Sequence, residues 1–331
     1  MTEAGRINNE LMVSIIVPVF NVVSYIKESL HSLTNQEFTE AYEIILVDDA
    51  STDASLKVCR QFAVDHADKI RLLENQTNTG VSIARNLGLE QARGRYLMFV
   101  DADDILPPRA LASLFDAVEK NNADIAKGNL VLFDSNSRRP APDHIRAGKV
   151  ISGEDVLTTL FAHSEVRGHA GGKIFRRDKF GQVRFTTGVR MTEDLLYFSE
   201  IFAAAESLVL LETEVYEYRK HPAGSTGSKY ETGSYIDWLG AVEKCGEFAS
   251  TARQKRAHKD LLLRSMTQIA RECRKISGAS AMPVLDLMEK KRRQWNLRFF
   301  PLVARDRLGL RSLSRYIKLR LALKQVRNNL S

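Results

Sequence analysis

The sequence predicts an α/β protein with a mainly parallel sheet flanked by helices, followed by a helical C-terminal region. Short apolar runs rich in branched residues alternate with segments of helical periodicity as far as about residue 230, and beyond it only helical spacing remains. A chain of 331 residues has room for one large domain and a smaller one. We therefore expect a first domain at 1–230, with halves at 12–110 and 111–230, and a helical region at 231–331.

The elements of the first half follow one another in a regular order. Buried strands are predicted at 13–21, 43–47, 70–73 and 96–100, and helices at 22–34, 56–64 and 81–92. Strands that alternate with helices in this way form parallel sheets through right-handed crossovers. Ligands of such sheets bind beyond the carboxyl ends of the strands. The residues that follow the strands are therefore the first candidates for a functional site.

Carboxylates gather directly after two of these strands. The fourth strand ends in Asp101, Asp103 and Asp104, and the second ends in Asp48 and Asp49. In an extended segment Asp101 and Asp103 would point the same way. Two hard oxygen ligands on one side suit Mg²⁺ or Mn²⁺, which can also hold a diphosphate. The competing interpretation is a solvated strand end that caps the next helix.

Several other classes of protein are excluded. No G-x-G-x-x-G follows the first strand, and Gly172-Lys173 fails as a P-loop because positions 167 and 174 are Arg and Ile. Three scattered cysteines suit neither a disulfide framework nor a zinc site, which favours a reducing compartment. We find no signal peptide and no apolar run long enough for a membrane span.

These motifs together resemble the family 2 glycosyltransferases, whose GT-A fold has a mainly parallel, Rossmann-like sheet. The matching segments are residues 14–21, 43–53, 78–80, 84–88 and 94–104, and one departure is Ala50, where the family usually has Gly. The resemblance implies an inverting, metal-dependent enzyme that moves a hexosyl or N-acetylhexosaminyl group from a nucleotide sugar. The acceptor would be a hydroxyl of a glycan or lipid-linked molecule in bacterial surface-polysaccharide synthesis.

The resemblance also implies where the donor binds. The residues expected to contact it are Pro18, Phe20, Asn21, Asp48, Asp49, Asn78, Arg85, Asp101, Ala102, Arg219 and Lys220. A carboxylate at Asp49 that faces an imide N–H suits uracil, so we favour a UDP-sugar. Asp103 would ligate the divalent metal, Mn²⁺ or Mg²⁺. For Asp48 the alternative role is a turn cap.

The second half resembles the acceptor part of the same family. Residues 172–177 match a recurrent segment, without the aromatic residue usual just upstream, and Glu193-Asp194 matches the family's acidic motif. Asp194 would be the base that takes the acceptor's proton. The alternative is a helix start in which Thr192 is the N-cap and the two acids complement the helix dipole.

A basic segment follows the predicted strand at 215–218. Arg219 or Lys220 could neutralise the diphosphate, and His221 could ligate the metal or donate to a phosphate. The alternative for His221 is an ordinary solvated side chain.

The C-terminal region combines predicted helices at 236–249, 256–276 and 282–294 with a strongly basic tail. From Lys290 onward there are thirteen Lys or Arg residues and one acid, Asp306, a net +12. Because the whole chain carries +7, residues 1–289 carry −5. Basic residues interleaved with aromatics suit an anionic membrane surface, which suggests a cytoplasmic enzyme on the inner face of the plasma membrane. A tail docked on the body or on a second subunit is the alternative, and no nucleic-acid-binding motif accompanies the charge.

Two other functions remain to be compared with sugar transfer. A nucleotidyltransferase also uses acids at strand ends, but normally carries an early Gly-rich basic loop that this sequence lacks. A non-catalytic sugar-nucleotide-binding protein would have a decayed site, whereas Asp49, Asp103 and Asp194 are all present.

Overall fold

The computed structural model describes residues 10–162, 165–222, 232–273, 282–294 and 323. The chain forms two compact units. The first comprises Met1–Gly153, Ala170–Thr187 and Ala205–Gly227, and the second comprises Glu154–His169, Gly188–Ala204 and Ser228–Ser331. The second unit thus takes two segments from the middle of the chain in addition to the C-terminal region.

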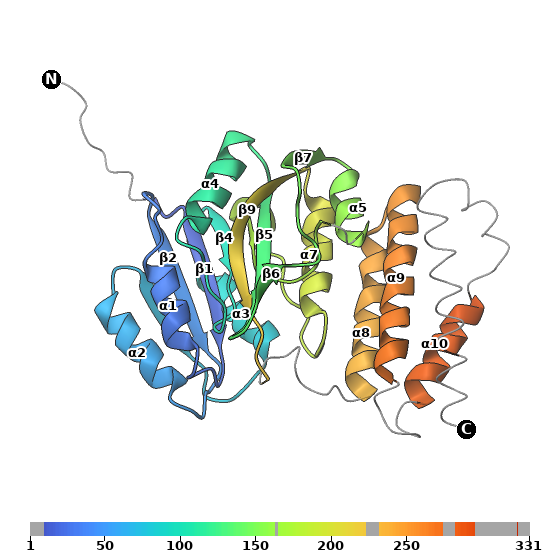
Figure 1. Ribbon diagram of the computed structural model, residues 1–331, viewed down its shortest axis with the longest axis horizontal. Coiled ribbons are helices and arrows are strands. Elements are labelled where there is room, and N and C mark those ends of the chain that lie inside the picture. The colour runs from blue at the N-terminus through green and yellow to red at the C-terminus, as the bar shows by residue number, and fades with distance from the viewer. Residues whose placement is uncertain (1–9, 163–164, 223–231, 274–281, 295–322, 324–331) are drawn as a thin grey trace. The chain divides into compact units, whose positions relative to one another are not determined.

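A nine-stranded sheet forms the centre of the first unit (Figure 1). Its strands are β1 (Val13–Val19), β2 (Tyr42–Asp48), β3 (Ile70–Glu74), β4 (Tyr96–Phe99), β5 (Ile125–Phe133), β6 (Arg138–Pro140), β7 (Lys149–Ser152), β8 (Lys173–Arg176) and β9 (Ser207–Arg219). The order is β3-β2-β1-β4-β8-β5-β9-β7, with β6 paired to β5. Only β6, β7 and β8 run against the common direction of the others, so the prediction of a mainly parallel sheet is confirmed.

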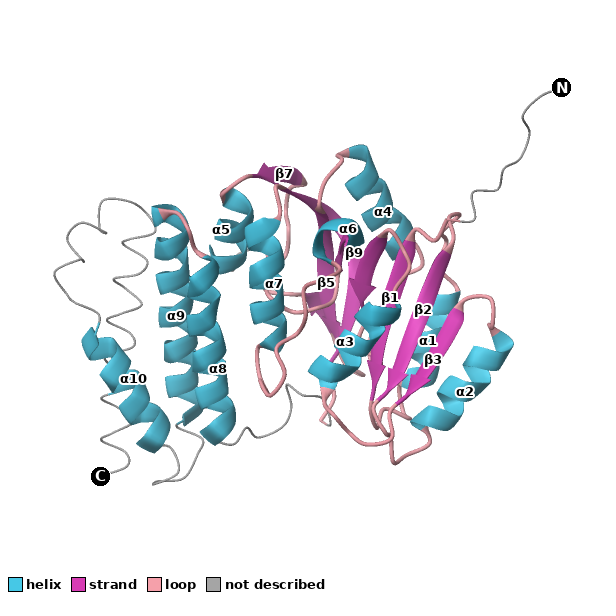
Figure 2. Ribbon diagram, turned by 180° about the vertical axis from the view of Figure 1, so that it is seen from behind, coloured by secondary structure: helices cyan, strands magenta, loops and turns pink. Residues whose placement is uncertain are grey.

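Helices cover both faces of this sheet. They are α1 (Ile26–Thr34), α2 (Ser55–Asp65), α3 (Val81–Gln91), α4 (Ala110–Lys120) and the short α6 (Arg177–Phe180). Figures 1 and 2 show α1, α2 and α4 on one face and α3 on the other. For α1, α2 and α3 this follows from the strand order, because right-handed crossovers place a helix on the opposite face when the chain reverses its direction across the sheet.

The alternation of side chains along β1 supplies both faces with apolar contacts. Ile15 lies in a core cluster with Leu30 of α1 and Leu114 of α4, all fully buried. Burying a leucine completely stabilises the fold by about 1.5–3 kcal/mol. Ile16 faces α3, where Gly88 packs so closely that a Cβ atom would lie 2.4 Å from Ile16 Cγ2. Glycine is therefore required for α3 to lie against the sheet.

The direction of the strands brings separate parts of the sequence to one edge. Because β1, β2, β4 and β9 run the same way, their carboxyl ends meet there. The segments that follow them are 20–25, 49–54, 100–104 and 220–222. These are the segments in which the sequence places its candidate site.

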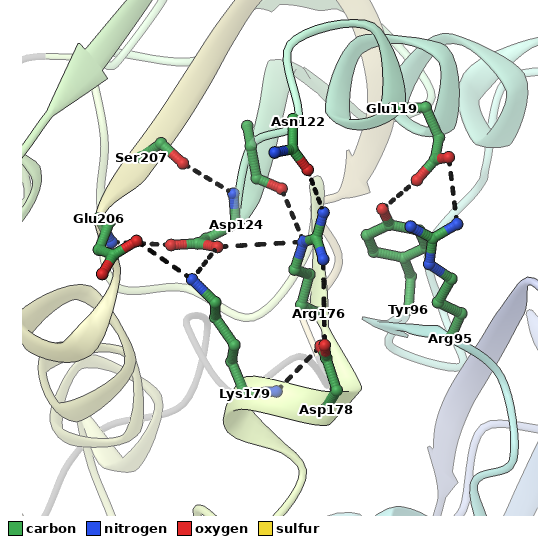
Figure 3. A network of polar contacts seen from close by, with 11 residues as sticks. Arg95, Tyr96, Glu119, Asn122, Asp124, Arg176, Asp178, Lys179, Glu206 and Ser207 are labelled. Atoms are coloured by element: carbon green, nitrogen blue, oxygen red, sulfur yellow. Dashed lines mark hydrogen bonds and ion pairs between the residues drawn. The ribbon is translucent and has the colours of Figure 1, made fainter.

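A network of polar contacts closes the opposite edge, where the parallel strands begin (Figure 3). Asp124, directly before β5, is buried, and its carboxylate accepts the Glu206 N–H and pairs with Lys179 Nζ at 2.8 Å. The Asp124 N–H donates to Ser207 Oγ at 3.1 Å. One buried carboxylate thus connects the beginnings of β5 and β9 with α6.

The second unit is helical, as predicted. Its helices are α5 (Asp155–Ala162), α7 (Glu193–Ala204), α8 (Thr232–Lys244), the 3₁₀ helix η1 (Cys245–Phe248), α9 (Ala252–Glu272) and α10 (Met282–Gln294). A capping box starts α9: Thr251 Oγ1 accepts the Gln254 N–H, and the Gln254 side chain accepts the Thr251 N–H. Among the described helices none is long and apolar enough to cross a membrane. Beyond Gln294 the predicted basic tail lies outside the described residues, apart from Leu323.

Candidate active site

Asn21 joins the loops that follow β1 and β2. Its backbone is left-handed, with a φ of 52°, a conformation that asparagine tolerates better than most residues. Its Oδ1 accepts the N–H groups of Thr52 at 2.8 Å and Asp53 at 3.3 Å. Pro18 lies within β1, while Phe20 is 43% exposed. Among the residues predicted to contact the nucleotide sugar, Phe20 has a partly exposed ring. The Asn21 side-chain oxygen instead connects the loops that follow β1 and β2.

The two carboxylates at the end of β2 have different surroundings. Asp48 is fully buried, and its Oδ2 accepts a backbone N–H of the following turn at 3.0 Å, as a turn cap does. Asp49 accepts hydrogen bonds of 2.7–3.1 Å from Asn75, Thr79 and Gly80. Burial opposes the charge on Asp49, but these hydrogen bonds outweigh it and lower the pKa of the carboxyl group. Asp49 is therefore ionised and fixes the loop before α3.

Two residues next to Asp49 were singled out in the sequence. Asn78 is exposed, directly before the Thr79-Gly80 pair that holds Asp49. Ala50 has a φ of 58°, so it adopts left-handed backbone at the position where the family usually has glycine. The turn keeps a glycine-like conformation at a steric cost of about 1–2 kcal/mol.

Arg85 and Asp101 form an ion pair between α3 and the end of β4. Arg85 is buried, and its Nη2 lies 2.9 Å from Asp101 Oδ1. The guanidinium lies 5.1 Å from the ring centroid of Phe185, a cation–π contact. Asn86 holds Phe185 through two hydrogen bonds with its backbone. The sequence singles out Arg85 and Asp101 separately, and Phe185 not at all, because it lies a hundred residues away in an unremarkable segment.

Residues 101–104 form a turn, so the prediction of an extended pair of aspartates is wrong. β4 ends at Phe99, and the Asp104 N–H donates to the Asp101 carbonyl at 3.0 Å. Ala102 is buried inside the turn. The turn directs the three carboxylates to three different partners, because a tight turn breaks the alternation of side chains that holds in a strand.

Asp103 and His221 come together from two of the converging segments. Asp103 Oδ2 lies 2.8 Å from His221 Nε2, and the Tyr25 ring contacts the imidazole in a tilted arrangement with centroids 4.2 Å apart. Burial and the neighbouring Asp101 raise the pKa of Asp103, although His221 opposes them. A bound cation would favour the charged carboxylate.

The chemistry of this pair fits a divalent metal. Carboxylate oxygen suits Mg²⁺ and Mn²⁺, and imidazole nitrogen is a ligand of divalent transition metals. Within the described part of the chain no group of three or more His, Cys, Asp or Glu side chains could hold a metal. Asp103 and His221 would therefore supply two ligands and leave the other positions to diphosphate oxygens and water, as is common for metal–nucleotide sites.

Arg219 is more engaged with the protein than the sequence suggests. Its Nε donates to the Asp103 carbonyl at 2.8 Å, and its Nη2 lies 2.6 Å from a Glu28 carboxylate oxygen. The guanidinium also lies over the Tyr25 ring and, at 4.5 Å, over the Phe133 ring. These contacts suit a residue that fixes the site rather than one that reaches out to a diphosphate. Lys220, next along the chain, is exposed.

Asp194 lies in the second unit, on the first turn of α7. Its Oδ1 accepts the Leu195 N–H at 2.7 Å. Thr192 has a φ of 62°, and its hydroxyl donates to the Met191 carbonyl. The Thr192 hydroxyl thus bonds the preceding residue, and Asp194 itself bonds a backbone N–H of the first turn.

The chain was compared with known proteins. A family model described as "Glycosyl transferase family 2" matches residues 14–184. Glycosyltransferase GlyA of Streptococcus pneumoniae is 33% identical over 216 residues, which cover 62% of this chain and 30% of GlyA. The minor teichoic acid biosynthesis protein GgaA of Bacillus subtilis is 28% identical over 215 residues, which cover 63% of this chain and 47% of GgaA. The chain therefore spans less than half the length of either relative.

Solved structures share the fold. TarS residues 1–349 of S. aureus, in complex with UDP-GlcNAc, superpose with a TM-score of 0.71 at 18% identity, covering 96% of this chain and 92% of the other. The mannosyltransferase PcManGT of Pyrobaculum calidifontis, in complex with GDP-Man and Mn²⁺, gives a TM-score of 0.56 at 16% identity, covering 93% and 87%. The family match spans more than half of the chain, and it agrees with the sheet and the motifs at its carboxyl edge. The chain belongs to glycosyl transferase family 2 and has a GT-A-like fold.

Proposed function

We propose that this chain is an inverting, metal-dependent glycosyltransferase that uses a UDP-sugar in surface-polysaccharide synthesis. The observation that carries the proposal is the Asp103–His221 pair, two residues along the chain from the Asp101–Arg85 pair, at the carboxyl edge of the sheet. The UDP-GlcNAc complex of TarS supports a uridine nucleotide and an N-acetylhexosaminyl group, and the name of GgaA supports a cell-envelope glycan.

The donor would bind in parts to different residues of the first unit. The exposed ring of Phe20 would lie against the base, and Asp49 would accept its imide N–H. Asp103 and His221 would hold Mn²⁺ or Mg²⁺. Arg85, oriented by its ion pair with Asp101, would face the diphosphate. When bound, the metal would stabilise the charge that develops on the departing diphosphate. The manganese complex of PcManGT supports this assignment.

Asp194 would provide the base of the reaction. Its carboxylate would take the proton of the acceptor hydroxyl while that oxygen bonds to the anomeric carbon. The bond between this carbon and the phosphate oxygen breaks in the same step, and UDP leaves with the electron pair. A single displacement of this kind inverts the anomeric configuration. Asp194 lies on the first turn of α7, where the helix dipole favours negative charge.

The acceptor would be a hydroxyl of a glycan or of a lipid-linked intermediate. A lipid-linked acceptor would lie at the membrane surface, where the basic tail would hold the enzyme as a peripheral protein.

The donor can be tested first, with the full-length protein and Mn²⁺. A panel of nucleotide sugars is compared by thermal shift, because a ligand that binds only the folded state raises the melting temperature. We expect a UDP-sugar to give the largest shift and EDTA to remove most of it. A larger shift with GDP-sugars, or no effect of EDTA, would contradict the donor or the metal assignment.

The base can be tested with Asp194→Asn, which keeps the shape of the side chain. We expect kcat to fall by at least about a hundredfold, the lower range of general-base contributions, while donor affinity stays near that of the wild type. Glu193→Gln, on the same helical turn, is the matched control and should keep most turnover. If both variants lose activity in proportion to their melting temperature, the two acids only stabilise the start of the helix.

A further inference from the structure

Of the three carboxylates in the 101–104 turn, that of Asp104 is too deeply buried to act as a metal ligand. It is 1% exposed, and both its oxygens accept hydrogen bonds from the protein. Oδ2 accepts the Tyr216 hydroxyl at 2.7 Å, and Oδ1 accepts the Arg219 N–H at 2.8 Å. Both oxygens of the buried Asp104 thus bond groups of β9, whereas Asp103, one residue earlier, keeps 23% of its side chain exposed.

The Tyr216 hydroxyl contacts both ends of this turn. It donates to Asp104 and accepts the Asp101 N–H at 3.0 Å. Tyr216 is itself buried in β9, five residues before His221. One hydroxyl group therefore ties the segment that carries Asp103 to the strand that leads to His221.

Backbone contacts complete the connection between the two segments. Ile105 and Glu217 exchange two hydrogen bonds of 3.0 and 2.9 Å as an isolated antiparallel bridge. Arg219 donates from its backbone to Asp104 and from its Nε to the Asp103 carbonyl. The Ile105–Glu217 bridge fixes the register of the two segments. The hydrogen bond between the Asp104 and Tyr216 side chains fixes the 101–104 turn next to it.

We propose that Asp104 and Tyr216 are positioning residues that set Asp103 and His221 at the spacing a divalent cation needs. The inference rests on the proposed function, in which this pair holds the metal. Groups that orient metal ligands by hydrogen bonds generally change metal affinity by 10–100-fold when they are removed.

The surroundings of Tyr216 make a clean substitution possible. A Cβ atom on Gly171 would lie 2.4 Å from the Tyr216 ring, so the ring fits closely against this glycine. Tyr216→Phe keeps the ring in place and removes only the hydroxyl. Asp104→Asn keeps the acceptor for the Arg219 N–H, but it presents an N–H₂ group to a hydroxyl that already accepts from Asp101.

The test measures Mn²⁺ binding directly, without turnover. Full-length protein with UDP is titrated with Mn²⁺, and free Mn²⁺ is followed by electron paramagnetic resonance. We expect Tyr216→Phe and Asp104→Asn each to weaken Mn²⁺ binding by about tenfold, and Asp103→Asn to weaken it further. The matched control is Tyr42→Phe, because the buried Tyr42 hydroxyl donates to the Leu33 and Thr34 carbonyls far from the site.

The outcomes separate this inference from the proposed function. If Tyr216→Phe and Tyr42→Phe lower the melting temperature alike and both bind Mn²⁺ as the wild type does, Asp104 and Tyr216 are merely structural and the inference is wrong. If the wild type itself binds no Mn²⁺ in the presence of UDP, the metal assignment of the proposed function fails, and the inference falls with it. Weaker Mn²⁺ binding in Tyr216→Phe, Asp104→Asn and Asp103→Asn, with Tyr42→Phe binding as the wild type does, supports both.

Discussion

Asp49 has two tasks if it binds the donor. Its oxygens already receive hydrogen bonds from the Asn75 amide, the Thr79 N–H and hydroxyl, and the Gly80 N–H. A base N–H that reaches this carboxylate would have to share or replace one of these donors, since a carboxylate offers about four lone-pair sites. Donor binding would therefore be coupled to the loop that leads into α3 and Arg85.

We expect Asp49→Ala to raise the donor KM much more than it lowers kcat. The contact to the base is equal in the ground and transition states, so its loss removes uniform binding. Hydrogen bonds to a charged group contribute about 1.5–3 kcal/mol, which corresponds to a rise in KM of at least about tenfold. Steady-state kinetics at saturating metal measures both parameters.

Asp53→Ala is the control for this experiment. Asp53 also accepts loop N–H groups, from Val23 and Ser55, but it has no proposed contact with the donor. It should lower stability and leave the donor KM nearly unchanged. A defect of Asp49→Ala in kcat alone would place Asp49 in the chemistry and overturn its assignment to the base.

At the residue scale, the sequence could identify the polar clusters but not how each group is used. Asn21, Asp48 and Arg219 all lie at the predicted edge, yet their polar atoms mainly bond the protein itself. Which carboxylate stays available depends on partners from distant segments, such as Tyr216 for Asp104. A single sequence does not reveal these pairings, because the residues around Asp104 do not indicate that Tyr216 is its partner.

At the element scale, the strands with strong apolar runs were predictable and the reversed ones were not. β1, β2 and β4 are buried on both faces and are predominantly apolar. β8 is a four-residue strand, Lys173–Arg176, with two basic residues, so its pattern does not distinguish it from a loop. Its place between β4 and β5 is fixed by pairing on both sides. The predicted helix at 22–34 begins only at Ile26, because residues 22–25 form turns held by Asp53 and Ser55.

The edge opposite the site gives a stability prediction. Asp124→Ala should destabilise the protein by about 1–3 kcal/mol, because it leaves the Glu206 N–H without its acceptor and removes a partner of Lys179. Asp178→Ala is the control: this carboxylate is 66% exposed and lies 3.9 Å from Arg176, so its loss should cost about 0–1 kcal/mol. Denaturant unfolding gives both values. Equal effects of the two substitutions would show that the Asp124 network contributes little.

At the scale of the whole molecule, the charge is divided unevenly. Residues 1–289 carry −5 and the remainder carries +12. The net negative charge of residues 1–289 favours the binding of a divalent cation, and the cation would in turn bind the anionic donor. The cations of the tail are not needed for that chemistry, so they require a separate explanation.

The last prediction concerns this tail and uses a chain cut after Gln294, where α10 ends. The cut removes nine Lys or Arg residues and one acid, together with Trp295, Phe299 and Phe300. Each basic residue near an anionic surface contributes on the order of 1 kcal/mol, which salt screens, and buried aromatics add a part that salt does not affect. We expect the full-length protein to sediment with anionic vesicles at low salt and the cut protein to remain in the supernatant. Turnover on a soluble acceptor should be the same for both, while turnover on a lipid-linked acceptor should fall after the cut. If the full-length protein ignores the vesicles, and the cut only lowers the melting temperature or changes the oligomeric state, the tail packs on protein rather than on membrane.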